Sequence, residues 1–226
     1  MKRALAPLIL GFAASLGTVR ADDAATRPAA TSLTHPKSAT QRVDARGFIH
    51  RWLVLEPVAV TGRLTESAVE ETVRSAPLPG AMDSLPRDGE VVTLPGGAVA
   101  WHALDTINYN LNLYHFARAL SKPTSNVLFW ATTTVIAPRE MPGIRLAIGS
   151  NAASRWWLNG EPVIALNDDR QAVIDDGVSR RLTLRQGRNV IRTAIVNAGG
   201  ATDFCARFLD GNDQPITDLS VSLSSD

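Results

Sequence analysis

Short apolar segments that end at turn-forming residues most constrain the fold of this chain. Residues 127–137 place apolar side chains at alternate positions, and Asn159-Gly160 separates residues 155–158 from residues 161–165. Asn-Gly tolerates the positive φ angles of a type I′ turn, which makes it the strongest short signal for a β-hairpin. Similar segments recur about every eight to twelve residues, which is typical of sandwiches and barrels.

The same criteria predict strands at residues 48–55, 90–94, 98–104, 144–149, 178–184, 189–196, 204–208 and 221–223. Residues 65–74 fit a helix, because Ser67 and Glu70 match a capping box ahead of apolar residues at helical spacing. Residues 107–120 fit neither period. Strands and helices do not alternate, which disfavours α/β folds. We therefore predict an all-β fold, an antiparallel β-sandwich of jelly-roll type with one short helix.

The beginning of the chain indicates export. Two basic residues precede an apolar stretch that is too short to span a bilayer, and small residues follow at the usual cleavage offsets. We predict a signal peptide over residues 1–21, a flexible leader over residues 22–44 and a sandwich domain over residues 45–226. The protein is expected in the periplasm or outside the cell, without membrane insertion after cleavage of the signal.

Charge and cysteine content exclude two classes of protein. The chain of 226 residues has 23 basic and 22 acidic residues, a net charge of +1, and no basic tract. Electrostatic capture of nucleic acid is therefore not expected. Cys205 is the single cysteine of the sequence, so no internal disulfide can form.

Four stretches together resemble galactose-binding-like jelly-roll modules. Residues 52–57 are similar to the opening W-L-v-L-G-P strand of these modules, and residues 149–160 to their G-S-D-D-G-x-x-V-W-L-N-G hairpin. Residues 184–191 are similar to L-x-x-G-x-N-x-l, and residues 204–213 to F-x-l-R-l-x-D-x-d-G. The resemblance spans about residues 47–216.

The resemblance implies a module of the kind attached to bacterial glycoside hydrolases, polysaccharide lyases and acetyl xylan esterases. Glu56 stands where the modules have glycine, and Ala152-Ala153 replace the acidic residue and glycine that follow Ser150. Any ligand or calcium role of that acidic turn is therefore in doubt for this chain. The turn residues also have plain structural roles, which explain most of the motif without a ligand.

Catalytic residues do not stand out. The sequence has no Gly-x-Ser-x-Gly elbow, and its nearest serine motif, Gly149-Ser150-Asn151, lies in the hairpin described above. The four histidines, His35, His50, His102 and His115, pair with no particular serine or acid in the sequence. We predict no catalytic residue, and zinc ligands show no regular spacing.

Candidate ligand-binding residues combine aromatic and polar side chains. Aromatic rings can stack on the apolar face of a sugar while amides and arginines bind its hydroxyls. The candidates are Trp101, Tyr109, Asn110, Tyr114, Arg155 and Trp157. Trp157 points away from Trp156, so we expect one of the two to be exposed.

One loop carries four acidic residues, Asp168, Asp169, Asp175 and Asp176. Calcium requires several oxygen ligands on a bent loop, so calcium is the one cofactor that these residues suggest. A solvated loop is the competing interpretation.

Three functions stay open. The first is an exported, non-catalytic module that recognises carbohydrate or envelope glycan. The second is an acetyl ester hydrolase acting on plant polysaccharide. The third is an envelope scaffold with a protein partner.

Overall fold

Sixteen strands and two helices form the part of the chain that the computed structural model describes, residues 33–78 and 80–224. The strands are β1 (Leu33–Thr34), β2 (Thr40–Arg42), β3 (Arg51–Leu55), β4 (Val58–Ala59), β5 (Val91–Leu94), β6 (Gly97–Thr106), β7 (Leu111–Asn112), β8 (Val127–Ala137), β9 (Met141–Ser150), β10 (Ala153–Leu158), β11 (Glu161–Leu166), β12 (Gly177–Val178), β13 (Leu182–Leu184), β14 (Gly187–Asn197), β15 (Asp203–Leu209) and β16 (Ser220–Ser222). The helices are α1 (Glu66–Ser75) and α2 (Leu113–Ala119). The predicted signal peptide lies outside the described residues.

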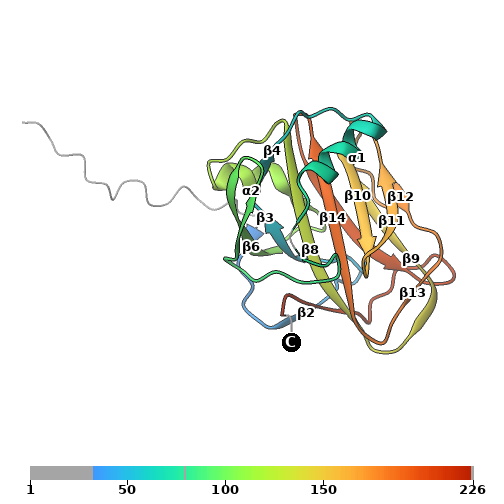
Figure 1. The fold of residues 1–226 in the computed structure, drawn as a ribbon. Coiled ribbons are helices and arrows are strands. Elements are labelled where there is room, and N and C mark those ends of the chain that lie inside the picture. The colour runs from blue at the N-terminus through green and yellow to red at the C-terminus, as the bar shows by residue number, and fades with distance from the viewer. Residues whose placement is uncertain (1–32, 79, 225–226) are drawn as a thin grey trace, which may run out of the picture.

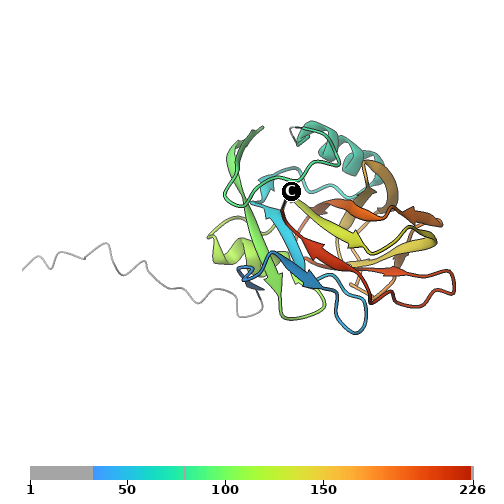
Figure 2. The same ribbon diagram turned by 90° about the horizontal axis from the view of Figure 1, so that it is seen from below.

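Two antiparallel sheets face each other (Figure 1 and Figure 2). The large sheet has the order β1-β6-β3-β8-β14-β10-β11, with β2, β4, β5 and β16 attached, and the small sheet has the order β12-β9-β15-β7, with β13 attached. Between them, Phe204 from the small sheet meets Trp52 and Trp156 from the large sheet edge to face, with ring centroids 4.9 and 5.5 Å apart. The predicted antiparallel β-sandwich is therefore confirmed; the galactose-binding-like jelly-roll type stays a prediction.

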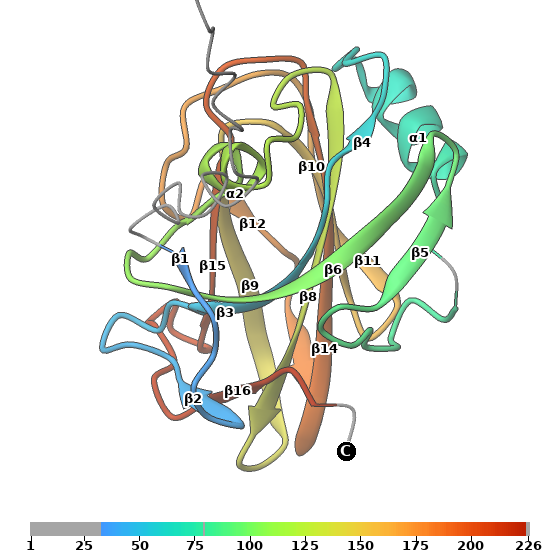
Figure 3. The same ribbon diagram turned by 90° about the vertical axis from the view of Figure 1, so that its left-hand side faces the viewer.

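The outer face of the large sheet is also covered. Helix α1 crosses β10 and β14 in Figure 1, and the β5–β6 hairpin stands beside it in Figure 3. Together with residues 76–78 and 80–85 they form an outer layer over a second apolar cluster. Apolar residues on both faces explain why the central strands have no exposed side.

Three side chains of the large sheet bind this outer layer through polar contacts. Trp130 Nε1 donates to the Ala76 carbonyl at 3.2 Å, and Arg155 Nε donates to the Glu70 carboxylate at 2.5 Å. Arg192 donates to the Ser84 carbonyl at 2.5 Å. The layer is thus held by directional bonds as well as by apolar packing.

Helix α1 confirms the predicted helix, shifted by one residue, but the predicted capping box is wrong. Thr65 is the N-cap and forms no side-chain cap bond, while Glu70 binds Arg155. The unassigned residues 107–120 contain a second helix, α2, whose N-cap Asn112 accepts a bond from the His115 amide at 2.7 Å. The described residues therefore contain two helices, whereas the sequence analysis predicted one.

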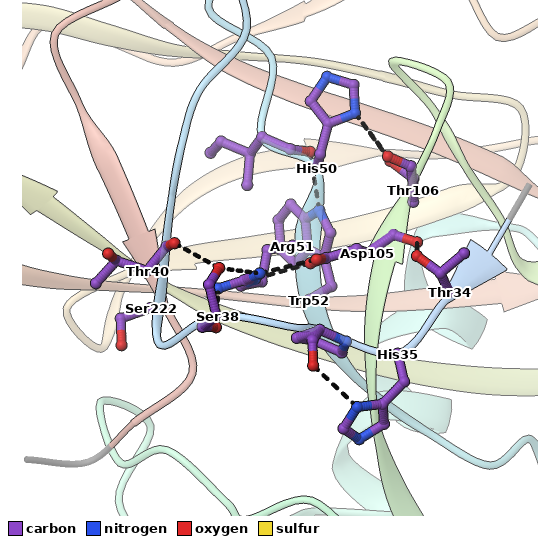
Figure 4. A network of polar contacts seen from close by, with 12 residues as sticks. Thr34, His35, Ser38, Thr40, His50, Arg51, Trp52, Asp105, Thr106 and Ser222 are labelled. Atoms are coloured by element: carbon purple, nitrogen blue, oxygen red, sulfur yellow. Dashed lines mark hydrogen bonds and ion pairs between the residues drawn. The ribbon is translucent and has the colours of Figure 1, made fainter.

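The predicted flexible leader is wrong for its described part, residues 33–44. β1 pairs with β6, and β2 pairs with β16. Arg51, only 2% exposed, binds the Asp105 carboxylate at 2.7 and 2.8 Å and the Ser38 carbonyl at 2.7 Å (Figure 4). The absence of apolar periodicity in this segment gave no indication of these contacts, because backbone pairing needs no side-chain pattern.

Candidate functional site

Two predicted ligand-binding tryptophans belong to the cluster under the outer layer. Trp101 on β6 is 2% exposed. Trp157 on β10 is half-buried, and its ring centroid lies 5.8 Å from that of Trp130. Trp156, on the opposite face, is fully buried. Neither Trp101 nor Trp157 therefore offers the open stacking face that the sequence suggested.

The other predicted aromatic and amide residues lie in a different region, around the β6–β7 loop and α2. Tyr109 is 38% exposed and packs against Phe48 at 5.2 Å between ring centroids. Asn110 is half-buried and bonds the Asp203 side chain. Tyr114 is half-buried beside Arg118. Hence the structure separates these three residues from the tryptophans.

Arg155 is buried rather than available to a ligand. The residue is 4% exposed. Its guanidinium binds the Glu70 carboxylate, the carbonyls of Ser154 and Leu166, and the Asn167 side chain. These bonds come from both the outer layer and β11. Arg155 therefore has a structural role in attaching α1 to the sheet.

The acidic loop contains two ion pairs, one of which attaches it to the small sheet. Asp175 binds Arg207 on β15 at 2.5 Å, whereas Asp176 binds Arg170 within the loop at 2.7 Å. Asp168 and Asp169 are exposed. Among residues 33–78 and 80–224, no group of three or more His, Cys, Asp or Glu side chains is placed to hold a metal ion. Calcium binding at this loop stays a prediction.

Ser150 is not placed as a nucleophile. Its side chain is fully buried and donates to the Ala152 carbonyl at 2.9 Å. This bond shapes the β9–β10 turn. The Gly149-Ser150-Asn151 motif is therefore structural, as the hairpin pattern indicated.

The nearest approach to a catalytic triad is Thr106, His50 and Asp44. His50 Nδ1 lies 3.1 Å from Thr106 Oγ1, and its Nε2 lies 3.1 Å from the Asp44 carboxylate (Figure 4 shows the His50 and Thr106 side chains). Thr106, however, is 6% exposed and donates to the Asn108 carbonyl at 2.7 Å. A nucleophile must reach its substrate, so this arrangement connects strands and does not form a reactive site.

A pocket of about 270 Å³ opens where the outer layer meets the large sheet. We call it the Arg192 pocket; its wall includes Leu78, Ser84, Leu85, Glu90, Val92, Trp101 and Arg192. The volume lies just below the roughly 300–1,000 Å³ of typical small-molecule sites, which suits a ligand with one ring. Trp101 contributes only a small part of the wall, because most of its ring is buried.

Arg192 is the unusual group in this pocket. It is 2% exposed and donates to the Ala81 and Ser84 carbonyls at 3.3 and 2.5 Å, whereas its Nε has no partner. Within the described residues it forms no ion pair with a carboxylate. Burial lowers the pKa of Arg192 to about 10, although nearby Asp83 acts in the opposite direction. A buried cation without a full set of partners is costly, and a ligand acceptor would reduce that cost.

Glu90 provides the complementary group. It is exposed, and its carboxylate accepts a bond from the Arg87 amide at 2.9 Å, which leaves further acceptor capacity. The pocket thus combines a cationic donor, an anionic acceptor and an apolar wall of Leu85 and Val92. This arrangement suits a neutral ligand with hydroxyl groups, since each hydroxyl both donates and accepts.

The sequence analysis did not identify Arg192 or Glu90. Arg192 stands between Ile191 and Thr193 in the strand predicted at 189–196, on the face opposite Ile191. A charged residue in a largely apolar strand was the available signal. Its interpretation required the outer layer, which no local pattern showed.

The fold and the site define a class: an antiparallel β-sandwich with an added outer layer and a small polar pocket. No family model matches the chain, and no curated protein matches it. Within the described residues, no helix is long and apolar enough to span a membrane.

Several solved structures share part of the arrangement. The PA14 domain of the MpAFP antifreeze protein has 13% identity and a TM-score of 0.41, covering 75% of this chain and 89% of that one. The PA14 sugar-binding domain from an RTX adhesin has 14% identity and a TM-score of 0.43, covering 76% and 96%. A β-glucosidase from Kluyveromyces marxianus, in complex with glucose, has 13% identity and a TM-score of 0.39, covering 70% and 15%. At these TM-scores the likenesses assign no ligand to this chain.

Proposed function

We propose that this protein is an exported, non-catalytic binding module that recognises carbohydrate through the Arg192 pocket. The observation that carries the proposal is that the buried Arg192 guanidinium and the exposed Glu90 carboxylate both line one small pocket. The predicted signal peptide supports export.

The chemistry of the pocket favours a sugar ring over a charged ligand. Arg192 donates to ring hydroxyls, Glu90 accepts from them, and Leu85 with Val92 contacts the C–H groups of the ring. An anion would be attracted by Arg192 but repelled by Glu90 and Asp83. A cation would be attracted by Glu90 and Asp83 but repelled by Arg192. A neutral polyol satisfies both groups.

Binding to a glycan array, followed by calorimetry with the strongest oligosaccharide, tests the proposal. Glu90→Gln should weaken binding by about tenfold or more, since hydrogen bonds to charged groups contribute about 1.5–3 kcal/mol. Glu140→Gln, an exposed change in the β8–β9 turn, is the matched control and should bind as the wild type does.

Other results would contradict the proposal. Release of acetate from acetylated xylan, lost in Ser150→Ala, would establish the hydrolase instead. Unchanged glycan binding in both Glu90→Gln and Arg192→Lys would place the site elsewhere. Absence of any glycan binding, with a protein recovered by crosslinking, would favour the scaffold.

A further inference from the structure

A second hollow lies between the two sheets, away from the Arg192 pocket. It has a volume of about 370 Å³ and runs between the β10–β11 hairpin and β13. Three arginines line it: Arg180, Arg181 and Arg185. We call it the arginine groove. Leu158, Val163 and Leu182 add apolar wall, all of them buried or half-buried.

The arginines differ in how they are held. Arg181 is fixed, because it donates to the carbonyls of Gly143 and Asp210 at 2.9 and 2.8 Å and pairs with Asp213 at 3.0 Å. Arg180 and Arg185 are exposed, and within the described residues neither guanidinium has a hydrogen bond or ion pair. The groove therefore presents two cationic groups that are free to bind.

Negative charge near the groove does not balance the positive charge. Arg145 also reaches Asp213, at 3.6 Å, and Glu161 is the one carboxylate among the described residues of the groove wall. Four arginines thus stand against two carboxylates, an excess of two positive charges. The chain as a whole carries only +1, so this excess is local.

We propose that the arginine groove binds the acidic groups of an anionic polysaccharide, a glycan that carries carboxylates or sulfates. This inference rests on the proposed carbohydrate function and adds a second site and a charge class to it. A guanidinium fork matches a carboxylate or sulfate in two-bond geometry. The apolar wall of Leu158, Val163 and Leu182 contacts the sugar rings between the acidic groups.

The groove favours a glycan over a nucleic acid. Single-stranded nucleic acids bind where aromatic side chains stack on bases along a basic track. In the part of the chain that the structure describes, no aromatic residue lines the arginine groove.

Calorimetry with a hexamer of galacturonate tests the proposal, with a sulfated oligosaccharide as the second probe and a neutral galactose hexamer for comparison. Arg180→Gln/Arg185→Gln should weaken binding of an acidic probe by tenfold or more. Whichever acidic probe binds more tightly identifies the carboxylate or the sulfate as the recognised group. Binding of that probe should also weaken as salt is raised from 0.05 to 0.5 M, since exposed charges are screened.

Arg63→Gln/Arg118→Gln is the matched control, because it removes two exposed positive charges elsewhere. Equal losses in the two double variants would overturn the proposal in favour of non-specific attraction. Equal or tighter binding of a DNA oligonucleotide that depends on Arg180 and Arg185 would also overturn it.

The two sites can fail independently. If acidic probes do not bind while a neutral glycan binds and is lost in Glu90→Gln, the arginine groove proposal is wrong and the Arg192 pocket stands. If acidic probes bind through Arg180 and Arg185 and Glu90→Gln leaves glycan binding unchanged, the proposal for the arginine groove is correct. The Arg192 pocket is then not the glycan site.

Discussion

The carbonyl oxygen of Val173 lies against the backbone of Gly149, so that a β-carbon built on Gly149 would be 2.3 Å from it. The acidic loop therefore crosses directly over β9. The φ angle of Gly149 is not in the left-handed region, so the backbone conformation does not require glycine here. Glycine is required because the Val173 carbonyl leaves no room for a side chain. The cysteine sulfur of Cys205 lies at the same place, 3.1 Å from that position.

Gly149→Ala should displace this loop from the small sheet. Backbone cannot move aside as a flexible side chain can, so we expect a loss of about 1–3 kcal/mol in the free energy of unfolding. Denaturant unfolding measures the loss. Gly211→Ala is the control, because nothing lies within 4 Å of its added β-carbon. Equal stability of the two variants would contradict the close packing of the loop.

Cys205 should react very slowly with thiol reagents in the folded protein. It is 5% exposed, and burial raises its pKa to about 11, so little thiolate is present at pH 8. Asp175→Asn removes the ion pair with Arg207 that holds the loop. If the loop opens more easily by about 1.4 kcal/mol, the labelling rate should rise about tenfold. Labelling of the wild type at the rate of an unfolded peptide would refute the burial of Cys205.

Glu70→Gln should destabilise the protein through Arg155. The substitution leaves a buried guanidinium without its carboxylate, although the bonds to the Leu166 carbonyl and Asn167 remain. We expect a loss of about 1.5–3 kcal/mol, the range for hydrogen bonds to charged groups. Glu71→Gln is the control from the same helix, since its exposed pair with Arg74 should contribute at most about 1 kcal/mol. Thermal melts of both variants decide between these values.

The pair of His35 and Asp88 should stabilise the folded protein most at intermediate pH, and its contribution should be lost both in acid and in base. Burial acts to raise the pKa of Asp88, but bonds from His35 and the Ala103 amide outweigh it, so the pKa lies below the ordinary 3.8. The hydrogen bond to Asp88 raises the pKa of His35 above 6.5. The carboxylate contribution is present above pH 3.8 and is lost as the pH falls; the histidine contribution is complete below 6.5 and is lost as the pH rises.

Thermal unfolding from pH 3 to pH 9 tests this window. Asp88→Asn should flatten both limbs, while His35→Gln should chiefly flatten the limb above pH 6.5. An unchanged profile in Asp88→Asn would show that the pair is not formed in solution.

Hairpins and strands could be predicted from the sequence because their signals are local. Asn159 takes the positive φ of 51° that the turn requires, and its side chain accepts a bond from the Val190 amide at 2.9 Å. The Asn189 side-chain amide donates to the carbonyls of Arg185 and Gly187 at 2.8 and 3.1 Å. The motifs behind the family resemblance therefore form turns and connect strands. For this reason they predict the fold better than the function.

The site could not be predicted in the same way. Aromatic residues were taken as ligand contacts because of their chemistry, but Trp101 and Trp157 pack under the outer layer. The groups that line the Arg192 pocket come from segments about a hundred residues apart, Glu90 and Arg192. Only the tertiary arrangement places them together. The histidine at position 35, assigned to a flexible leader, likewise gains its partner from a distant loop.

The outer layer over the large sheet can open without unfolding of the whole sandwich. Its cluster is separate from the one between the sheets. Small, separately packed units commonly open at lower free energy than the main core. On gentle heating, exchange of amide hydrogens should therefore begin in α1 and residues 80–90 while the sandwich stays protected. The Arg192 pocket would then open before the sandwich unfolds, and a ligand bound there would delay that first step alone.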